Sequence, residues 1–231
     1  MSDSGSSGRG TVVLVHGYFK GAGDMIPLRG FLADFGYRAV TAHLPATFGS
    51  LDDCCDALME TIHALDTDGG PLHLVGHSFG GLVIRSYLAH AEVTGLGRCV
   101  LIGTPNRGSR LADIGRRFFR LVFRILKPLD SLTTDAPPIP PPRNDPPPEI
   151  GIIAGNRNRL ISGIFLSRES DGRVEVESAK LEGMTDFIIL PFIHMRIHKR
   201  RETAELVDRF LRTGRFGECN ERLPERFARR P

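Results

Sequence analysis

Short, mainly apolar stretches alternate with longer amphipathic stretches along most of this chain. The short stretches have the length of a single strand, and they cover residues 11–15, 38–43, 72–75, 98–103, 149–155 and 187–191. The longer stretches repeat apolar positions at helical spacing, and they cover residues 25–35, 51–65, 82–90 and 202–211. Strands that are apolar on both faces are typical of parallel sheets covered by helices. The pattern therefore predicts an α/β fold with a mostly parallel central sheet flanked by helices.

Polar residues and glycines mark the ends of several predicted helices. Ser50 precedes the helix over residues 51–65, where its side chain can cap the first turn. Gly36 and Gly214 follow the last apolar position of two other helices, and glycine is the preferred residue just beyond a helix end. These signals set the expected helix boundaries.

One junction between a strand and a helix has the sequence Gly76-His77-Ser78-Phe79-Gly80. Glycines on both sides of Ser78 allow a sharp turn, where any β-carbon would collide with the strand or the helix. The turn presents Ser78 at the carboxyl end of the strand. A serine that only caps a helix fits the short pattern too, but the strand before it and the helix after it favour a nucleophile.

The first strand runs directly into His16-Gly17-Tyr18. Because the carboxyl ends of parallel strands share one edge, this loop is expected beside Ser78, with the N–H of Tyr18 facing a developing oxyanion. The second donor is the N–H of Phe79, at the start of a helix where unpaired N–H groups favour negative charge. We expect His16 to be a structural residue that shapes the loop, because the chemistry needs only one histidine base.

The candidate acid is Asp171, which lies in a turn with Gly172 after a core strand and before the last histidines. The order nucleophile, acid, histidine is one of the known orders of a catalytic triad. Glu182 and Asp186 are rival acids, but neither lies in a tight turn.

Two histidines follow Asp171 in the sequence, His194 and His198. His194 lies nearer the end of the last strand, whereas His198 is expected at or inside the following helix. His194 is therefore favoured as the base.

Composition limits the class of protein further. The chain has 231 residues, enough for one domain, which we expect to cover residues 11–216 between a disordered leader (1–10) and a polar basic tail (217–231). Its 30 Lys and Arg against 27 Asp and Glu are too balanced to suggest binding of nucleic acid. The four cysteines lack metal-ligand spacing, and neither a signal peptide nor a membrane-spanning run is present, so a cytoplasmic protein is expected.

Two segments add candidate roles. A basic amphipathic helix is expected over residues 111–127, capped by Ser109, and such a helix can make peripheral contact with an anionic membrane. A solvated face packed on the domain is the favoured alternative. Residues 128–149 are rich in proline and predict an extended loop, which is either a rim or lid of the site or a passive surface crossover.

Several motifs together resemble the α/β-hydrolase superfamily, and more narrowly its bacterial lipase and esterase-like members. The resemblance rests on VLVHG, LVGHSFGG, GTPNRGS, IAGN, SDGRVEVESAKLEGM and FLRTGRF, which span most of residues 11–216. It implies the α/β-hydrolase fold with a small or absent cap and a triad of Ser78, Asp171 and His194. The oxyanion N–H groups would then belong to Tyr18 and Phe79.

The resemblance also implies an activity: hydrolysis of an apolar ester or lipid through an acyl-enzyme, with no metal or organic cofactor. An acyltransferase or thioesterase can use the same triad. A binding protein without catalytic activity remains a further alternative, because a fold does not dictate its function.

Overall fold

The computed structural model describes residues 9–65, 70–118, 126–158 and 169–217. Its centre is a six-stranded sheet in the order β2-β1-β3-β4-β5-β6, and every neighbouring pair is parallel. The strands are β1 (Thr11–Val15), β2 (Arg38–Thr41), β3 (Leu72–His77), β4 (Leu96–Ile102), β5 (Ile150–Gly155) and β6 (Asp186–Leu190). The predicted α/β fold is confirmed, and the described sheet is parallel throughout.

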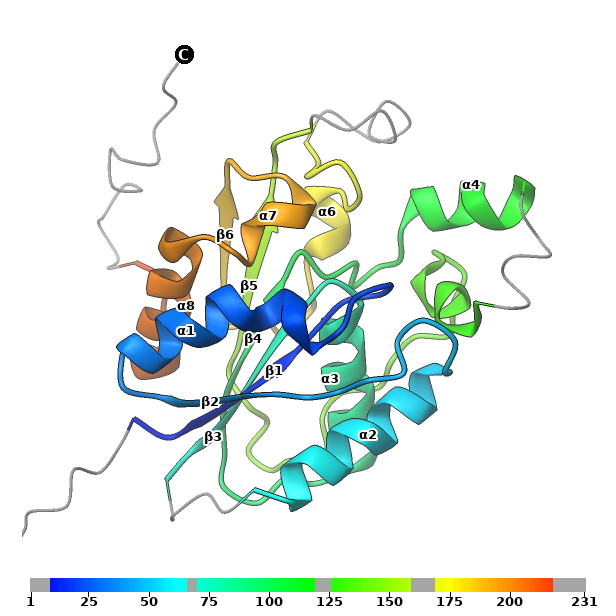
Figure 1. Cartoon of the computed structure of the whole chain (residues 1–231). Coiled ribbons are helices and arrows are strands. Elements are labelled where there is room, and N and C mark those ends of the chain that lie inside the picture. The colour runs from blue at the N-terminus through cyan, green and yellow to red at the C-terminus, as the bar shows by residue number, and fades with distance from the viewer. Residues whose placement is uncertain (1–8, 66–69, 119–125, 159–168, 218–231) are drawn as a thin grey trace, which may run out of the picture.

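Four long helices cover the two faces of the sheet (Figure 1). Helices α1 (Ile26–Asp34) and α8 (Arg201–Thr213) share one apolar core with alternate residues of β1, whereas α2 (Leu51–His63) and α3 (Phe79–His90) share the other. β1 shows the division, since Val12 and Leu14 belong to the first core and Val13 and Val15 to the second. Burial of each such side chain stabilises the fold by about 2 kcal/mol.

The helix ends follow local chemistry in most places. Ser50 accepts a hydrogen bond from the N–H of Asp53, and the Asp53 side chain accepts one from the N–H of Ser50, which confirms the predicted cap of α2. Gly214 ends α8 with a φ of 73°, a conformation that suits glycine.

Helix α3 begins at Phe79, as expected for the residue after the nucleophile, and thus before the apolar pattern that starts at Leu82. A β-carbon at Gly80 would lie 2.2 Å from the carbonyl oxygen of Val15, and one at Gly81 would lie 2.0 Å from Oγ1 of Thr104. These glycines therefore belong to the helix and let it pack closely against the strand ends.

Further helices lie on the side of the sheet where the strands end: η1 (Ala22–Met25), α4 (Arg110–Phe118), η2 (Lys127–Leu132), α6 (Val176–Ala179) and α7 (His194–Ile197). The prediction of one helix over residues 111–127 is wrong at its C-terminal end. Leu126 has non-helical backbone angles, and a separate 3-10 helix starts at Lys127 with Pro128 in its first turn.

The proline-rich segment is held against α3. The side chain of Asn144 donates to the carbonyl of Val93 and accepts from its N–H, and the N–H of Arg143 donates to the carbonyl of Leu88. Arg85 on α3 reaches the carbonyl of Ile139 at 3.5 Å. These contacts fix the extended segment along α3, and its role as a lid stays a prediction.

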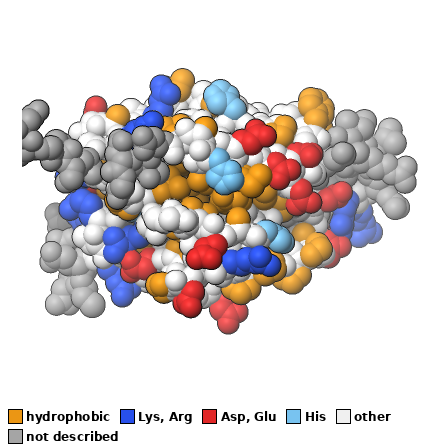
Figure 2. All heavy atoms as spheres, turned by 90° about the horizontal axis from the view of Figure 1, so that it is seen from below, with side chains coloured by type: hydrophobic (Ala, Val, Ile, Leu, Met, Phe, Trp, Pro, Cys, Tyr) orange, Lys and Arg blue, Asp and Glu red, His pale blue; other side chains and the backbone are white. Residues whose placement is uncertain are grey.

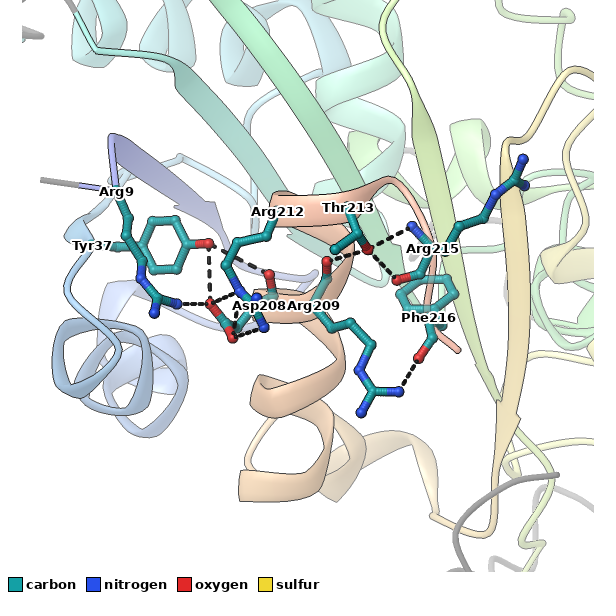
Figure 3. A network of polar contacts seen from close by, with 8 residues as sticks. All are labelled: Arg9, Tyr37, Asp208, Arg209, Arg212, Thr213, Arg215 and Phe216. Carbon is teal, nitrogen blue, oxygen red and sulfur yellow. Dashed lines mark hydrogen bonds and ion pairs between the residues drawn. The ribbon is translucent and has the colours of Figure 1, made fainter. Parts of the chain in front are cut away.

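A polar network ties α8 to the beginning of the sheet (Figure 3). Asp208 accepts hydrogen bonds from Arg9 at 2.5 Å, from the hydroxyl of Tyr37 at 3.2 Å and from Arg212 at 3.0 Å. Burial, with Asp208 beside it, raises the pKa of Tyr37 to about 12, so this hydroxyl stays protonated and donates. The network holds α8 in place, and α7 directly precedes that helix in the chain.

Charge and hydropathy set limits on partners. On the face shown in Figure 2, the described acidic and basic side chains are interspersed around a band of apolar ones, without a continuous basic patch. Among the described helices, none is long and apolar enough to cross a membrane.

Cys54, Cys55 and Cys99 are free thiols. Cys219 and almost all of the predicted leader and tail lie outside the described residues.

Candidate active site

Ser78, Asp171 and His194 meet at the carboxyl edge of the sheet. Ser78 follows β3, Asp171 lies between β5 and β6, and His194 begins α7 after β6. Oγ of Ser78 lies 2.9 Å from Nε2 of His194, and Nδ1 of His194 lies 2.7 Å from Oδ2 of Asp171. The structure thus brings the three predicted residues into one chain of hydrogen bonds.

The turn at Ser78 is strained. Ser78 has a φ of 55°, which costs a residue with a β-carbon about 1–3 kcal/mol. Its N–H donates to the carbonyl of Ile102, and its own carbonyl accepts from the N–H of Gly81 and from Oγ1 of Thr104. These bonds hold the turn, and the strained backbone directs the side chain toward His194.

The hydrogen bonds of Asp171 leave one of its carboxylate oxygens available to orient a histidine. Its Oδ1 accepts the N–H groups of Arg173 and Val174 at 2.9 and 2.8 Å, which leaves Oδ2 for His194. A carboxylate only accepts hydrogen bonds, so Nδ1 of His194 carries the proton and Nε2 is free to take one from Ser78. The hydrogen bond between the N–H of His194 and the carbonyl of Asp171 fixes the two main chains as well.

The rival acids have other surroundings. Contrary to the prediction, Glu182 does lie in a turn, where it is exposed. The carboxylate of Asp186 accepts the N–H groups of Phe187 and Phe216. Neither rival lies beside His194 in the described hydrogen bonds, which leaves Asp171 as the acid that contacts it.

The loop after β1 lies against the serine, as predicted. A β-carbon at Gly17 would be 3.2 Å from Cβ of Ser78, and Tyr18 lines the same cavity as Ser78. His16 is fully buried; its Nδ1 donates to the carbonyl of Gly17, and its Nε2 accepts from the N–H of Leu44. Burial lowers the pKa of His16, which keeps it neutral. The structural role predicted for His16 is confirmed.

A cavity of about 390 Å³ opens beside Ser78 and His194. Its walls are mostly apolar side chains from the loop after β1, α4, η2, the turn before α6, and α7: Tyr18, Phe19, Leu111, Ala112, Leu129, Leu132, Val174 and Met195. Lys20 and Arg173 add positive charge to the lining. Of the segment 128–149, only Leu129 and Leu132 reach this cavity among the described residues.

Helix α4 makes one wall of the cavity and carries Arg116 and Arg117, two of the basic residues of the predicted helix over residues 111–127. Arg116 pairs with Asp135 at 2.5 Å, and Asp113 accepts two hydrogen bonds from Thr134. Ser109 differs from the prediction: its hydroxyl donates to the carbonyl of Arg173, a contact across the site, while its main-chain carbonyl accepts from the first turn of α4. Arg124 lies outside the described residues.

Sequence reasoning missed a buried cluster next to His194. Nε2 of His77 lies 3.1 Å from the carbonyl oxygen of His194, and the ring of His77 stacks on that of His198 with 3.7 Å between centroids. Nε2 of His198 in turn lies 3.0 Å from Oδ2 of Asp24. The prediction treated His198 only as a rival base and His77 as a variable position of the turn motif. The spacing of His194 and His198, four residues apart, could have indicated that both lie in one cluster.

Fold and sequence together define the class of protein. The chain belongs to the alpha/beta hydrolase family, since the sequence model of that family matches residues 12–214. The predicted family and fold class are thereby confirmed. No curated protein sequence is significantly similar to this chain.

Several solved structures are similar to this one. The mature lipase BlEst2 of Bacillus licheniformis has 21% identity and a TM-score of 0.74, with 90% of this chain and 92% of that chain covered. The metagenomic carboxyl esterase MGS0156 has 15% identity and a TM-score of 0.67, covering 83% and 66%. Phospholipase PlaB of Legionella pneumophila has 18% identity and a TM-score of 0.61, covering 80% and 53%. At such identities the likeness establishes the fold.

Proposed function

We propose that this protein is a serine hydrolase that cleaves carboxylic esters, as an esterase or lipase, through Ser78, His194 and Asp171. The observation that carries the proposal is the unbroken chain of hydrogen bonds from Oγ of Ser78 through both ring nitrogens of His194 to Asp171. A serine that only capped α3 would need neither a base at 2.9 Å nor an acid behind that base.

The reaction has two halves. Nε2 of His194 takes the proton of Ser78 as Oγ attacks the ester carbonyl carbon, and a tetrahedral oxyanion forms. The protonated His194 then gives this proton to the departing alcohol oxygen, which leaves an acyl group on Ser78. Water attacks the acyl-enzyme with His194 again as base, and the acid is released. Asp171 stabilises the positive charge on the ring in both halves.

The N–H groups of Tyr18 and Phe79 are the proposed donors to the oxyanion. Phe79 is the first residue of α3, where N–H groups lack partners in the helix and the helix dipole favours negative charge. The loop of Tyr18 lies against Ser78 from the other side. Each donor of this kind contributes about 10²- to 10³-fold to turnover.

The cavity supports an apolar acyl group as the part of the substrate that is bound. Aromatic and aliphatic side chains dominate its lining, and a volume of about 390 Å³ is large enough for an acyl chain. The printed names of the similar structures, a lipase, a carboxyl esterase and a phospholipase, point the same way. Peripheral contact with an anionic membrane through residues 111–127 stays a prediction. Arg116 in this segment is paired with Asp135.

Hydrolysis of nitrophenyl esters with short to long acyl chains tests the proposal. We expect the intact protein to release nitrophenol and the S78A variant to lose at least about 10⁴-fold in kcat, because the nucleophile is gone. S86A is the matched control, since Ser86 is a buried serine on α3 that does not line the cavity beside Ser78.

The outcomes separate the alternatives. Equal activity of S78A and the intact protein would contradict the proposal. Acyl transfer to an added alcohol in preference to water would favour the acyltransferase, and turnover of thioesters alone would favour the thioesterase. Absence of turnover on every ester, with no labelling of Ser78 by a serine-directed phosphonate, would favour the binding protein.

A further inference from the structure

Asp24, His77, His198 and Lys199 form one group, which we call the histidine cluster; the two histidines are buried and Lys199 is partly exposed. His77 belongs to the turn that carries Ser78, and His198 and Lys199 follow the helix that begins with His194. Asp24 lies in η1, directly after the loop that carries Tyr18. Three of the four segments that bear the proposed catalytic groups therefore contribute to the same cluster, and the fourth is the turn of Asp171 between β5 and β6.

His77 contacts His194 both through the ring, with 4.9 Å between the ring centroids, and through the main chain. Its Nε2 lies 3.1 Å from the carbonyl oxygen of His194, and a carbonyl only accepts hydrogen bonds, so Nε2 of His77 carries a proton and donates it. His77 is almost completely buried, and burial holds its pKa well below the ordinary value. His77 is thus a neutral, fixed donor. It sets the main-chain position of the residue whose ring must face Ser78.

The remaining members hold His77 in place. His198 is fully buried and lies nearly parallel to His77, with 27° between the ring planes and 3.7 Å between centroids. Asp24 faces His198 at 3.0 Å and also pairs with the ammonium of Lys199. Burial by itself would raise the pKa of Asp24, but the contacts with His198 and Lys199 lower it well below its ordinary value. Asp24 is therefore a carboxylate that ties η1 to the chain after α7.

The same three side chains could be mistaken for a metal site, because their ligand atoms lie within 4.8 Å of one another. A metal ion needs the in-plane lone pairs of both imidazoles to converge on one point about 2 Å from each nitrogen. Two nearly parallel stacked rings direct these lone pairs side by side. The ammonium of Lys199 also pairs with Oδ1 of Asp24 and places a positive charge beside the cluster. The arrangement fits a cluster that fixes geometry.

We propose that the histidine cluster positions the catalytic base, with the hydrogen bond from His77 to the His194 carbonyl as its decisive contact. The inference rests on the proposed function, since it assigns His194 as the base. Misplacing a catalytic group by about 1 Å costs on the order of 10²-fold in rate. His77 is accordingly a positioning residue, which acts on turnover through the main chain of His194, although it also borders the cavity beside Ser78.

Two substitutions of His77 separate positioning from packing. H77L fills a similar volume without a donor, whereas H77Q removes the same ring but can place an amide N–H near the position of Nε2. We expect H77L to lower kcat on a nitrophenyl ester about 10- to 100-fold, with KM changed less than twofold. H77Q should recover most of the lost kcat. H73L is the matched control, because His73 is a buried histidine at the other end of β3 whose Nδ1 accepts from a main-chain N–H.

Proton NMR of the Nδ1–H of His194 gives a readout that does not need turnover. We expect its low-field resonance to be retained in the intact protein, H73L and H77Q, and to shift or broaden in H77L, because only that variant frees the His194 main chain. The intact protein could show the resonance, and H77L could lose it, while the intact protein hydrolyses no ester. In that case the proposed function fails and the positioning role stands.

The positioning role has its own contradicting results. Equal kcat values for H77L and H77Q would overturn it, and so would an unchanged resonance in H77L. A fall in the kcat of the intact protein after chelation would overturn it in favour of a metal ion.

Discussion

The ring of His194 and its main chain have contrasting surroundings. The two ring nitrogens contact Ser78 and Asp171 at 2.9 and 2.7 Å, and in the proposed reaction protons move at the ring. The main-chain carbonyl accepts from the buried, neutral His77, where the proton stays in place. The two sets of contacts of His194 thus have different roles. The contacts of the ring nitrogens with Ser78 and Asp171 decide whether a proton can move, and the hydrogen bond of the main chain with His77 helps to decide where the ring lies.

Replacing Asp171 gives the largest effect on the ring side. In D171N the amide oxygen can still accept the N–H groups of Arg173 and Val174, but the amide nitrogen donates to Nδ1 of His194. His194 then carries its proton on Nε2 and cannot take one from Ser78. We expect kcat to fall about 10³- to 10⁴-fold with little change in the thermal midpoint.

Steady-state kinetics on a nitrophenyl ester, with D186N as the control, measures this effect. A loss below tenfold in D171N would show that Asp171 is not the orienting acid. A loss confined to D186N would move that role to Asp186.

Replacing Asp24 gives a smaller effect on the main-chain side. D24N removes the negative charge that pairs with Lys199 and faces His198, while the ring contacts of His194 stay intact. We expect kcat to fall about threefold to tenfold, less than in H77L, because the hydrogen bond to the His194 carbonyl survives.

The control for D24N is D34N, because Asp34 is an exposed carboxylate on α1 with a single contact to Arg201 at 4.0 Å. Its kinetic constants should match those of the intact protein. A D24N variant that is as active as D34N would remove Asp24 from the positioning cluster.

His73 lies on the same strand as His77, but we expect its replacement to change the stability of the fold and not the turnover. Burial lowers the pKa of His73 to about 4. The unfolded chain binds the proton near its ordinary value of about 6.5, so stability is complete above that pH and is lost as pH falls toward 4. The loss attributable to His73 has a slope of about 1 kcal/mol per pH unit.

H73N removes this titration while its amide oxygen can still accept the N–H of Arg98. Urea unfolding at pH 7 and pH 5 should therefore show a smaller acid-induced loss in H73N than in the intact protein, with equal turnover at pH 7. Identical losses in the two proteins would mean that His73 titrates normally in the folded state.

Local patterns predicted the parts of the molecule that depend on near neighbours. The buried strand β1, the cap of α2 by Ser50 and the turn at Ser78 each follow from a few adjacent residues. The turn motif and the order of Asp171 and His194 were sufficient to select three residues that the structure brings together.

Contacts between segments that lie far apart in the chain could not be predicted from such local patterns. The hydroxyl of Ser109 reaches the carbonyl of Arg173, a residue 64 positions away, so its expected capping role did not appear. The helix predicted to reach Lys127 ends earlier because Pro128 favours a new turn. The histidine cluster joins Asp24 to His198, and no local period links those positions.

The most direct test of the central claim is the mass of the intact protein shortly after mixing with a slowly hydrolysed nitrophenyl ester. The account predicts an added mass of one acyl group, located on the peptide that contains Ser78, in the intact protein and in S86A, and no addition in S78A. An acyl group on another residue, or the same addition in S78A, would contradict the assignment of Ser78 as the nucleophile.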